Sequence, residues 1–254
     1  MQIFDAHAHL SNVTTTPHLQ TANNSDLPLP DYIVCNSTQP QDWSQTIDTC
    51  RLDKRLLPAL GIHPWYTNND YMLYLDKLSL YMSDLHAIGE TGLDKLRGNF
   101  TLQKASFIEH IRLADHLGLT LVVHCVKAFD ELYAIISKEK PKTSILIHGY
   151  NKSKQLAQQL CTICDCYFSL SPLFFETNNG ISEKKRQLLD YLILSNRLLL
   201  ETDFHFYYYK KEGIEEYQNL IQDSLNKITL VLKKDKATLS KNIFALSCKL
   251  FKAD

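Results

Sequence analysis

Two histidines near the start of this 254-residue chain, His7 and His9, are separated by a single residue. Side chains two positions apart on an extended strand point to the same side, so the two imidazoles can face one ion. Imidazole and carboxylate together suit Zn, Mn, Co and other first-row divalent ions, and a carboxylate-rich site can also hold Mg. Residues of these two kinds recur later, each at the end of a short apolar run: Glu90, His124, His148 and Asp203.

The number of these residues indicates how many ions they bind. Six potential ligands are more than one tetrahedral ion needs, and two ions that share one carboxylate account for them better. Two neighbouring ions can together polarise a phosphoryl oxygen, activate water and stabilise a leaving oxygen. The alternative is that each histidine is an ordinary polar residue at a strand end. Their recurrence at equivalent positions favours the metal site.

The apolar runs before these residues predict strands. Eight short runs rich in β-forming residues are expected at residues 2–6, 32–36, 56–62, 86–89, 119–124, 144–148, 166–170 and 197–201. Stretches with helical spacing lie between or after them, at residues 107–117, 129–136, 156–160, 188–192, 217–232 and 237–251, with Asp235 as the expected N-cap of the last.

This alternation predicts an α/β fold with a parallel sheet. At this length, eight strand–helix units fit one closed (β/α)8 TIM barrel that occupies residues 1–254 as a single domain. A doubly wound open sheet is the competing arrangement. In a barrel, the carboxyl ends of all strands open onto one face, and the metal site is expected on that face.

Composition excludes several classes of protein. Lys and Arg number 27 against 28 Asp and Glu, which excludes a strongly basic, non-specific nucleic-acid coat. No apolar run is long enough to cross a bilayer, and the first residues lack the basic and apolar segments of a signal peptide. We therefore expect a cytoplasmic protein with reduced thiols. Three closely spaced cysteines (Cys161, Cys164 and Cys166) lack a second cysteine pair or a histidine partner, so unpaired thiols are favoured over a zinc site.

Six sequence motifs resemble the TatD family of metal-dependent hydrolases, within the amidohydrolase-like barrel superfamily. Gly-Glu-Thr-Gly-Leu-Asp at residues 89–94 and Glu-Thr-Asp at residues 201–203 are the most specific of these motifs. The others occur in the family's order: Asp-Ala-His-Ala-His at 5–9, Gly-Ile-His-Pro at 61–64, Leu-Val-Val-His at 121–124 and Ile-His at 147–148. The resemblance covers about four-fifths of the chain.

This resemblance implies a barrel that holds a pair of divalent ions and hydrolyses phosphodiester bonds in DNA, often as an exonuclease. By position, His7 and His9 would bind one ion, Glu90 would bridge, and His124 and His148 would bind the second. Asp203 would complete the first site and accept the proton of the attacking water, so that Asp203 and Glu90 are the expected catalytic residues.

Other residues receive supporting roles. His63 resembles a contact to substrate phosphate, with a capping or packing role in its turn as an equal alternative. His205 either touches substrate or is a surface residue. Asp5 is expected to orient a histidine ligand, and Asp94 to hold the segment after Glu90 in place.

Departures from the family pattern concern the substrate and leave the ligands intact. Val126 stands where the family commonly has arginine, with Lys127 next to it, and Arg and Lys are not equivalent as phosphate ligands. Lys95, Arg97, Lys152, Lys154 and the run Tyr207–Lys211 are expected at the same ends of the strands, where they could form a cationic, aromatic rim. The favoured alternative is a partly packed loop at Tyr207–Lys211 and simply solvated lysines.

The predicted function is therefore that of a TatD-type deoxyribonuclease with DNA as substrate, no membrane association and no obligate protein partner. One alternative is the same binuclear site acting on a small ester, lactone or amide. The other is a barrel that has kept the fold only to bind a partner. Loss of a ligand would favour that last alternative, and no ligand is lost.

Overall fold

The computed structural model describes residues 2–10, 30–176, 181–205 and 213–253. Its strands form one sheet in which every neighbouring pair is parallel. In chain order they are β1 (Phe4–His9), β2 (Tyr32–Asn36), β3 (Leu56–Leu60), β4 (Ala87–Asp94), β5 (Thr120–Val126), β6 (Ile145–Ile147), β7 (Cys166–Leu170), β8 (Leu198–Leu200) and β9 (Phe204–His205).

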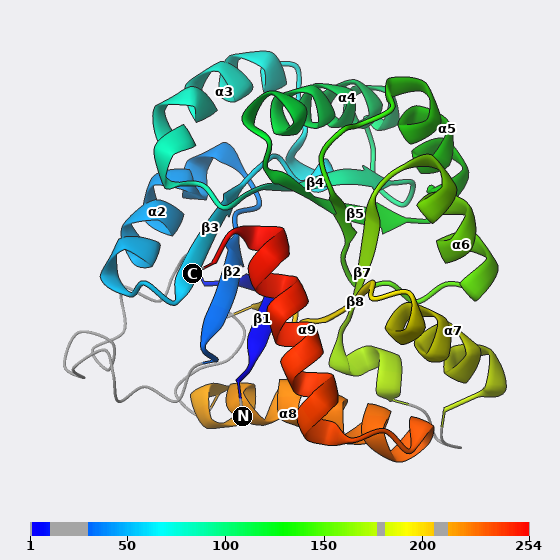
Figure 1. Cartoon of the computed structure of the whole chain (residues 1–254). Coiled ribbons are helices and arrows are strands. Elements are labelled where there is room, and N and C mark those ends of the chain that lie inside the picture. The colour runs from blue at the N-terminus through cyan, green and yellow to red at the C-terminus, as the bar shows by residue number, and fades with distance from the viewer. Residues whose placement is uncertain (1, 11–29, 177–180, 206–212, 254) are drawn as a thin grey trace.

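The sheet curves into a nearly closed barrel, with its strands surrounded by helices (Figure 1). Strands β1 to β8 are hydrogen-bonded in sequence order, and β8 pairs with β7. The short β9 follows β8 closely in the chain and pairs with β1. The eighth position of the barrel is therefore formed by two segments: β8 pairs with β7, and β9 pairs with β1. The predicted (β/α)8 barrel is confirmed, and the open sheet is excluded.

Helices follow the strands around the outside (Figure 1). They are α2 (Trp43–Leu52), α3 (Tyr71–Leu78), α4 (Phe100–Leu117), α5 (Phe129–Glu139), α6 (Lys154–Ile163), α7 (Glu183–Leu194), α8 (Gly213–Leu232) and α9 (Lys236–Phe251). The sequence did not predict α2, because its buried face contains Thr46 and Thr49 beside Trp43 and Ile47 and so lacks a clear apolar period. The expected cap of α9 is confirmed, since the Asp235 carboxylate accepts the Thr238 N–H.

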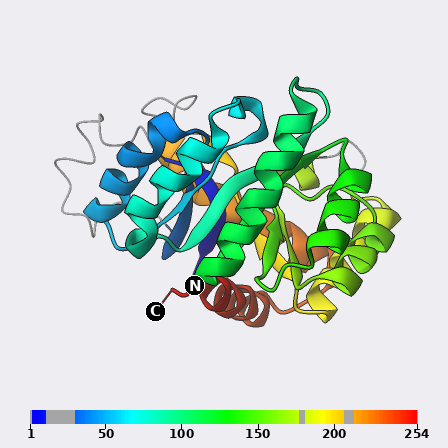
Figure 2. The same cartoon turned by 90° about the horizontal axis from the view of Figure 1, so that it is seen from above.

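Helix α9 closes the end of the barrel where the strands begin. Its apolar residues Leu246, Leu250 and Phe251 pack with the inner side chains of the strands, among them Phe4 and Leu57. A view turned by 90° shows α9 lying across one end of the strands (Figure 2). The catalytic residues expected from the sequence are at the opposite ends, so α9 contributes to stability and leaves the other face open.

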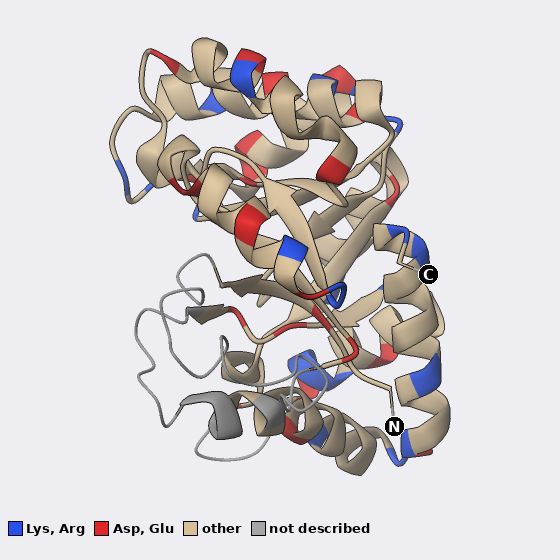
Figure 3. Cartoon of the chain, turned by 90° about the vertical axis from the view of Figure 1, so that its left-hand side faces the viewer, with Lys and Arg blue, Asp and Glu red and all other residues tan. Residues whose placement is uncertain are grey.

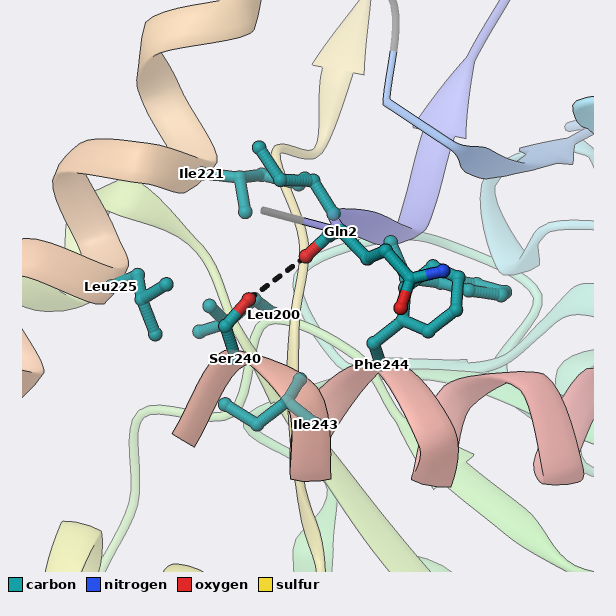
Figure 4. Close-up of a pocket in the computed structure, with 9 residues that line it drawn as sticks. Gln2, Leu200, Ile221, Leu225, Ser240, Ile243 and Phe244 are labelled. Atoms are coloured by element: carbon teal, nitrogen blue, oxygen red, sulfur yellow. Dashed lines mark hydrogen bonds between the residues drawn. The ribbon is translucent and has the colours of Figure 1, made fainter. Parts of the chain in front are cut away.

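The seam between α8, α9 and the start of the chain is filled by side chains (Figure 4). The Ser240 hydroxyl donates to the Gln2 carbonyl oxygen over 2.8 Å. Beside it lies a cavity of about 10 Å³, lined mainly by apolar residues such as Ile221, Leu225 and Ile243. That volume is about one water molecule, which makes the seam a packing interface with no room for a substrate.

Charges of both signs are spread over the helices on the side drawn in Figure 3, as the net charge of −1 leads one to expect. No helix among the described residues is long and apolar enough to cross a membrane. The seven cysteines are all free thiols. A cavity of about 540 Å³ lies between the starts of β2 and β3 and the end of the chain, at the opposite end from the expected site.

Candidate metal centre

A bulge in β1 turns its two histidines into the barrel. Between Asp5 and Ala8 the register against β2 shifts by one residue. Ala6 packs with the inner residues of the barrel, whereas Ala8 packs with the outer layer that contains Ile33 and Cys35. His7 and His9 therefore face inward together, as their spacing predicts, while Asp5 is directed away from them. The strand continues to His9, so the expected end at residue 6 is wrong.

A second bulge, in β4, presents Glu90. Here the register against β5 shifts between Ile88 and Thr91, and the strand continues to Asp94 instead of ending at residue 89. Gly92 has a φ of 140°, and a Cβ on it would lie 2.0 Å from the carbonyl oxygen of His124. Glycine at this position lets β4 and β5 approach closely enough to bring Glu90 and His124 together.

The first group of ligand atoms surrounds one oxygen of Glu90. His7 Nε2 and His9 Nε2 are 3.1 Å apart, and each lies 3.4 Å from Glu90 Oε2. Asp203 Oδ1 is 3.7 Å from both nitrogens. Asp203 reaches this position from a left-handed backbone conformation (φ 52°) between β8 and β9, with its N–H bonded to the His7 carbonyl oxygen.

The second group surrounds the other oxygen of the same carboxylate. Glu90 Oε1 lies 2.9 Å from His124 Nδ1 and 2.8 Å from His148 Nε2. These two ring nitrogens are 3.2 Å apart. A third imidazole joins them, because His63 Nε2 is 3.3 Å from Glu90 Oε1. The sequence did not identify His63 as a potential ligand.

These distances fit the geometry of bound divalent ions. Two ligand atoms each about 2.1 Å from a tetrahedral ion lie about 3.4 Å apart, which is close to the separations in the first group. The second group is slightly more compact. Ligand atoms from three sets of residues lie within 4.8 Å of one another: His7, Glu90 and His148; His7, His9 and Asp203; and His63, Glu90 and His124. The residues present therefore suit a metal centre built on both oxygens of Glu90.

Charge and burial act against each other in this cluster. Burial alone would raise the pKa of Glu90, but the surrounding imidazoles, with His148 the strongest, hold it well below its usual value. Burial and the neighbouring His148 lower the pKa of His7 to about 3. Burial raises the pKa of Asp203 to about 6. Glu90 thus stays negatively charged at the centre of the cluster.

Glu201, which the sequence analysis named in the Glu-Thr-Asp motif without giving it a role, lies directly behind His148. It is fully buried, and its carboxylate accepts the Gly149 N–H over 2.6 Å and the Ser169 hydroxyl. Its Oε1 lies 3.8 Å from Nδ1 of His148, the ring nitrogen that faces away from Glu90. This distance is longer than a hydrogen bond, so Glu201 acts on His148 through its negative charge. The Glu-Thr-Asp motif contains the signal that could have identified it.

Asp5 supports the centre through the backbone. Its carboxylate accepts the N–H groups of His7 and Thr202, and it also accepts the hydroxyls of Thr202 and Tyr217. Burial raises the pKa of Asp5 to about 7, although these hydrogen bonds lower it. Asp5 thus ties β1 to the segment that carries Asp203. Its contact with a candidate histidine ligand is to the backbone N–H of His7, because the β1 bulge directs Asp5 away from the rings.

The comparison with protein families decides which family these residues represent. A model of the family "TatD related DNase" matches residues 4–252. The chain belongs to this TatD family. The match extends over all the strands and over α8 and α9, so it includes every residue of the centre described above.

Several relatives carry names that state what is known of them. An uncharacterized metal-dependent hydrolase of Buchnera aphidicola is 28% identical over 212 residues, which are 80% of this chain and 78% of that protein. A 3′-5′ ssDNA/RNA exonuclease TatD of Cronobacter turicensis is 31% identical over 149 residues, which are 56% of this chain and 55% of that protein. The chain is therefore a metal-dependent hydrolase of the TatD family, and these names leave its substrate open.

Solved structures of TatD proteins share the fold. The TatD homologue YjjV of Escherichia coli superimposes with a TM-score of 0.78 at 18% identity, covering 99% of this chain and 98% of that one. A TatD family hydrolase of Entamoeba histolytica gives a TM-score of 0.75 at 16% identity over similar lengths. At these identities the likeness concerns the barrel alone.

Two further residues of the TatD motifs, His63 and Asp94, each make two contacts of different kinds. His63 Nδ1 accepts the Trp65 N–H and so caps the short 3-10 helix Pro64–Tyr66 (η4), while its other nitrogen faces Glu90. Asp94 accepts the Leu96 N–H, as expected of a residue that holds this segment, and it also accepts the Trp65 indole N–H over 2.6 Å.

Some predictions fall outside the described residues. The backbone of His205 lies in β9, but its side chain is not described. The run Tyr207–Lys211 also lies outside the described residues. Cys161, Cys164 and Cys166 are free thiols, and no cysteine belongs to a potential ligand cluster among the described residues.

His110 is a buried residue to which the sequence gave no role. From α4 it accepts the backbone N–H of Ile62 at Nε2 over 3.1 Å and donates from Nδ1 to the Ser106 carbonyl oxygen. The first bond holds the segment that carries His63. Burial lowers the pKa of His110 to about 4, and the hydrogen bond to Ser106 acts in the opposite direction. His110 is therefore neutral in the folded protein near pH 7.

A neutral buried histidine makes stability depend on pH. Below pH 6.5 the unfolded chain takes up a proton at His110 that the folded chain does not accept until about pH 4. Relative to His110→Gln, the wild type should lose about 2–3 kcal/mol of unfolding free energy between pH 7.5 and 4.5. Urea unfolding of both proteins measures this difference. His116→Gln, exposed on the same helix, is the control, and parallel pH curves for wild type and His110→Gln would contradict the assignment.

Proposed function

We propose that this chain hydrolyses phosphodiester bonds of DNA with two divalent ions held at the carboxyl ends of the barrel strands. The observation that carries the proposal is the position of Glu90. Its two carboxylate oxygens face separate sets of ring nitrogens, His7 and His9 on one side and His124, His148 and His63 on the other. A carboxylate with ligands on both sides is suited to bridge two ions.

The roles of the residues follow from this arrangement. His7, His9 and Asp203 would hold one ion, Glu90 would bridge, and His124 and His148 would hold the other, with Mg, Mn, Zn or Co all compatible with the donors. A bound divalent ion supplies Lewis acidity, which polarises a phosphoryl oxygen and lowers the pKa of water. Asp203 is partly exposed at the mouth of the cluster, where its carboxylate can take the proton of the attacking water.

DNA as the substrate is supported by the family and by the relatives named exonuclease. Cytoplasmic location and activity without an obligate protein partner stay predictions. The departure at Val126 removes the arginine expected behind His124, so other side chains of this chain must contact the phosphate or the bases.

An assay with three substrates tests the proposal. Purified protein supplemented with Mg, Mn, Zn or Co is offered single-stranded DNA, a simple phosphodiester and a carboxyl ester. We expect hydrolysis of both phosphates with DNA preferred, and Asp203→Ala should abolish this hydrolysis while leaving the unfolding free energy nearly unchanged. Preference for the ester over both phosphates would assign the site to small esters instead. Turnover by Asp203→Ala at the wild-type rate would overturn its role as proton acceptor.

A further inference from the structure

An exposed tryptophan stands directly beside the candidate metal centre. Trp65 lies in η4, and half of its surface is accessible to solvent. Its ring centroid is 5.1 Å from that of His63 and 6.5 Å from that of His124, with nearly perpendicular rings in both pairs. A large apolar ring left in solvent at this distance from candidate metal ligands indicates a contact surface for substrate.

The position of this ring is fixed by its neighbours. The indole N–H donates to Asp94 Oδ2 over 2.6 Å, and Asp94 lies at the end of β4, the strand that carries Glu90. The first residue of η4 follows His63, whose Nδ1 accepts the Trp65 N–H. Trp65 is therefore held at both its backbone and its indole by the framework of the metal centre, which keeps the ring in place before substrate arrives.

An arginine completes the surface. The Arg97 guanidinium lies 4.0 Å from the centre of the Trp65 ring. Arg97 is exposed, and no carboxylate of the described residues forms an ion pair with it. The neighbouring Lys95 differs, because it is paired with Glu131 over 2.5 Å. A guanidinium that is stacked on an indole and not paired with a carboxylate can donate to a phosphate from the edge of its own plane. A base can then stack on the part of the indole that solvent reaches.

We propose that Trp65 and Arg97 form a subsite that binds one nucleotide of a single-stranded nucleic acid next to the scissile phosphate, with Trp65 stacking on the base and Arg97 contacting the backbone phosphate. The proposal rests on the proposed phosphodiester hydrolysis, to which it adds a reason for preferring strands with bases. Stacking on a π-face is tolerant of sequence, so the subsite selects unpaired strands without selecting a particular base. Arg97 also supplies a phosphate contact on the face where Val126 has replaced the expected arginine.

The chain contains two tryptophans, which makes the test direct. Trp43 is buried, at 2% exposed, whereas Trp65 is half exposed, so a base that stacks on Trp65 quenches the accessible part of the fluorescence. The probe is a metal-supplemented titration with a short single-stranded DNA whose phosphorothioate linkages resist hydrolysis. A matched strand of abasic sites is the second probe. Binding is followed both by tryptophan emission and by the anisotropy of an end label on the DNA.

We expect the DNA to quench the wild-type emission and the abasic strand to quench it much less. Trp65→Ala should weaken binding of the DNA by about 5- to 100-fold and change binding of the abasic strand much less. Trp65→Phe should keep most of the affinity but lose the quenching. The proposal would be overturned if the DNA bound without quenching the emission, or if Trp65→Ala weakened binding of the DNA and of the abasic strand equally.

Arg97 is tested by salt dependence. Arg97→Ala should weaken binding of both the DNA and the abasic strand, and it should reduce the slope of log affinity against log salt by about one. Arg97→Lys should keep this slope and lose affinity mainly for the strand with bases. Arg186→Ala, an exposed arginine on α7, controls for the loss of one positive charge. An unchanged slope in Arg97→Ala would remove the phosphate contact from the proposal. These binding results do not depend on turnover, so a chain that binds as described but cleaves no phosphodiester would contradict only the proposed function.

Discussion

Glu90→Gln is expected to lower the affinity for divalent metal by more than about 100-fold and to remove hydrolysis at limiting metal. Glutamine keeps the shape of the side chain but loses the negative charge that the imidazole groups surround. Both oxygens of Glu90 are engaged, one with His7 and His9 and the other with His124, His148 and His63, so a single substitution affects both groups. Glu90 is 2% exposed, and water cannot replace the lost charge.

Isothermal titration with metal, together with metal content after dialysis, measures this effect. Glu176→Gln, an exposed glutamate in the described part of the chain, is the matched control and should retain wild-type binding. Circular dichroism separates loss of metal from loss of fold. If Glu90→Gln retained two ions per chain with wild-type affinity, the carboxylate would not be the bridge between the two groups.

Gly92→Ala is expected to reduce the unfolding free energy by about 3 kcal/mol or more. The added Cβ would lie 2.0 Å from the carbonyl oxygen of His124, and this contact is with backbone, which cannot rotate away as a side chain can. The φ of 140° at Gly92 adds backbone strain for any residue with a Cβ. Because β5 would have to move, His124 would shift relative to Glu90, and metal affinity should fall together with stability.

Gly98→Ala offers a matched control, since nothing lies within 4 Å of the position that its Cβ would take. We expect its unfolding free energy to stay within about 1 kcal/mol of the wild type. Urea unfolding of the three proteins tests the difference. Equal stability of Gly92→Ala and Gly98→Ala would show that β4 and β5 can separate without cost.

The sequence predicted the barrel and the proximity of the candidate ligands because both depend on patterns that local physics imposes. Apolar strands that alternate with helices leave few topologies, and a parallel barrel collects the residues at its strand ends on one face. The prediction that His7 and His9 face the same side required only the two-residue period of a β-strand. Glu90 Oε1, His124 Nδ1 and His148 Nε2 lie about 3 Å from one another. The prediction of a shared site depended on this proximity.

The sequence did not predict the strand bulges, helix α2 or the contacts of two buried histidines, because none of them leaves a periodic pattern in the sequence. The register shifts at β1 and β4 place Asp5 outside and Glu90 inside, and an extra residue in a strand leaves no mark in hydrophobicity. Helix α2 was missed because threonines contribute to its buried face. His63 and His110 acquire their roles through contacts with Glu90 and with the Ile62 N–H, partners that are distant in sequence.

The bonds between Asp5 and Thr202 join residues 197 positions apart, and they position the backbone that carries Asp203. During synthesis, His7 and His9 are followed first by Glu90, whereas Asp203 is made only after most of the barrel strands. Tyr217, which also bonds Asp5, emerges later still. A nascent or truncated chain that stops before α8 therefore lacks the Tyr217 bond to Asp5, and with it part of the support for the segment that carries Asp203.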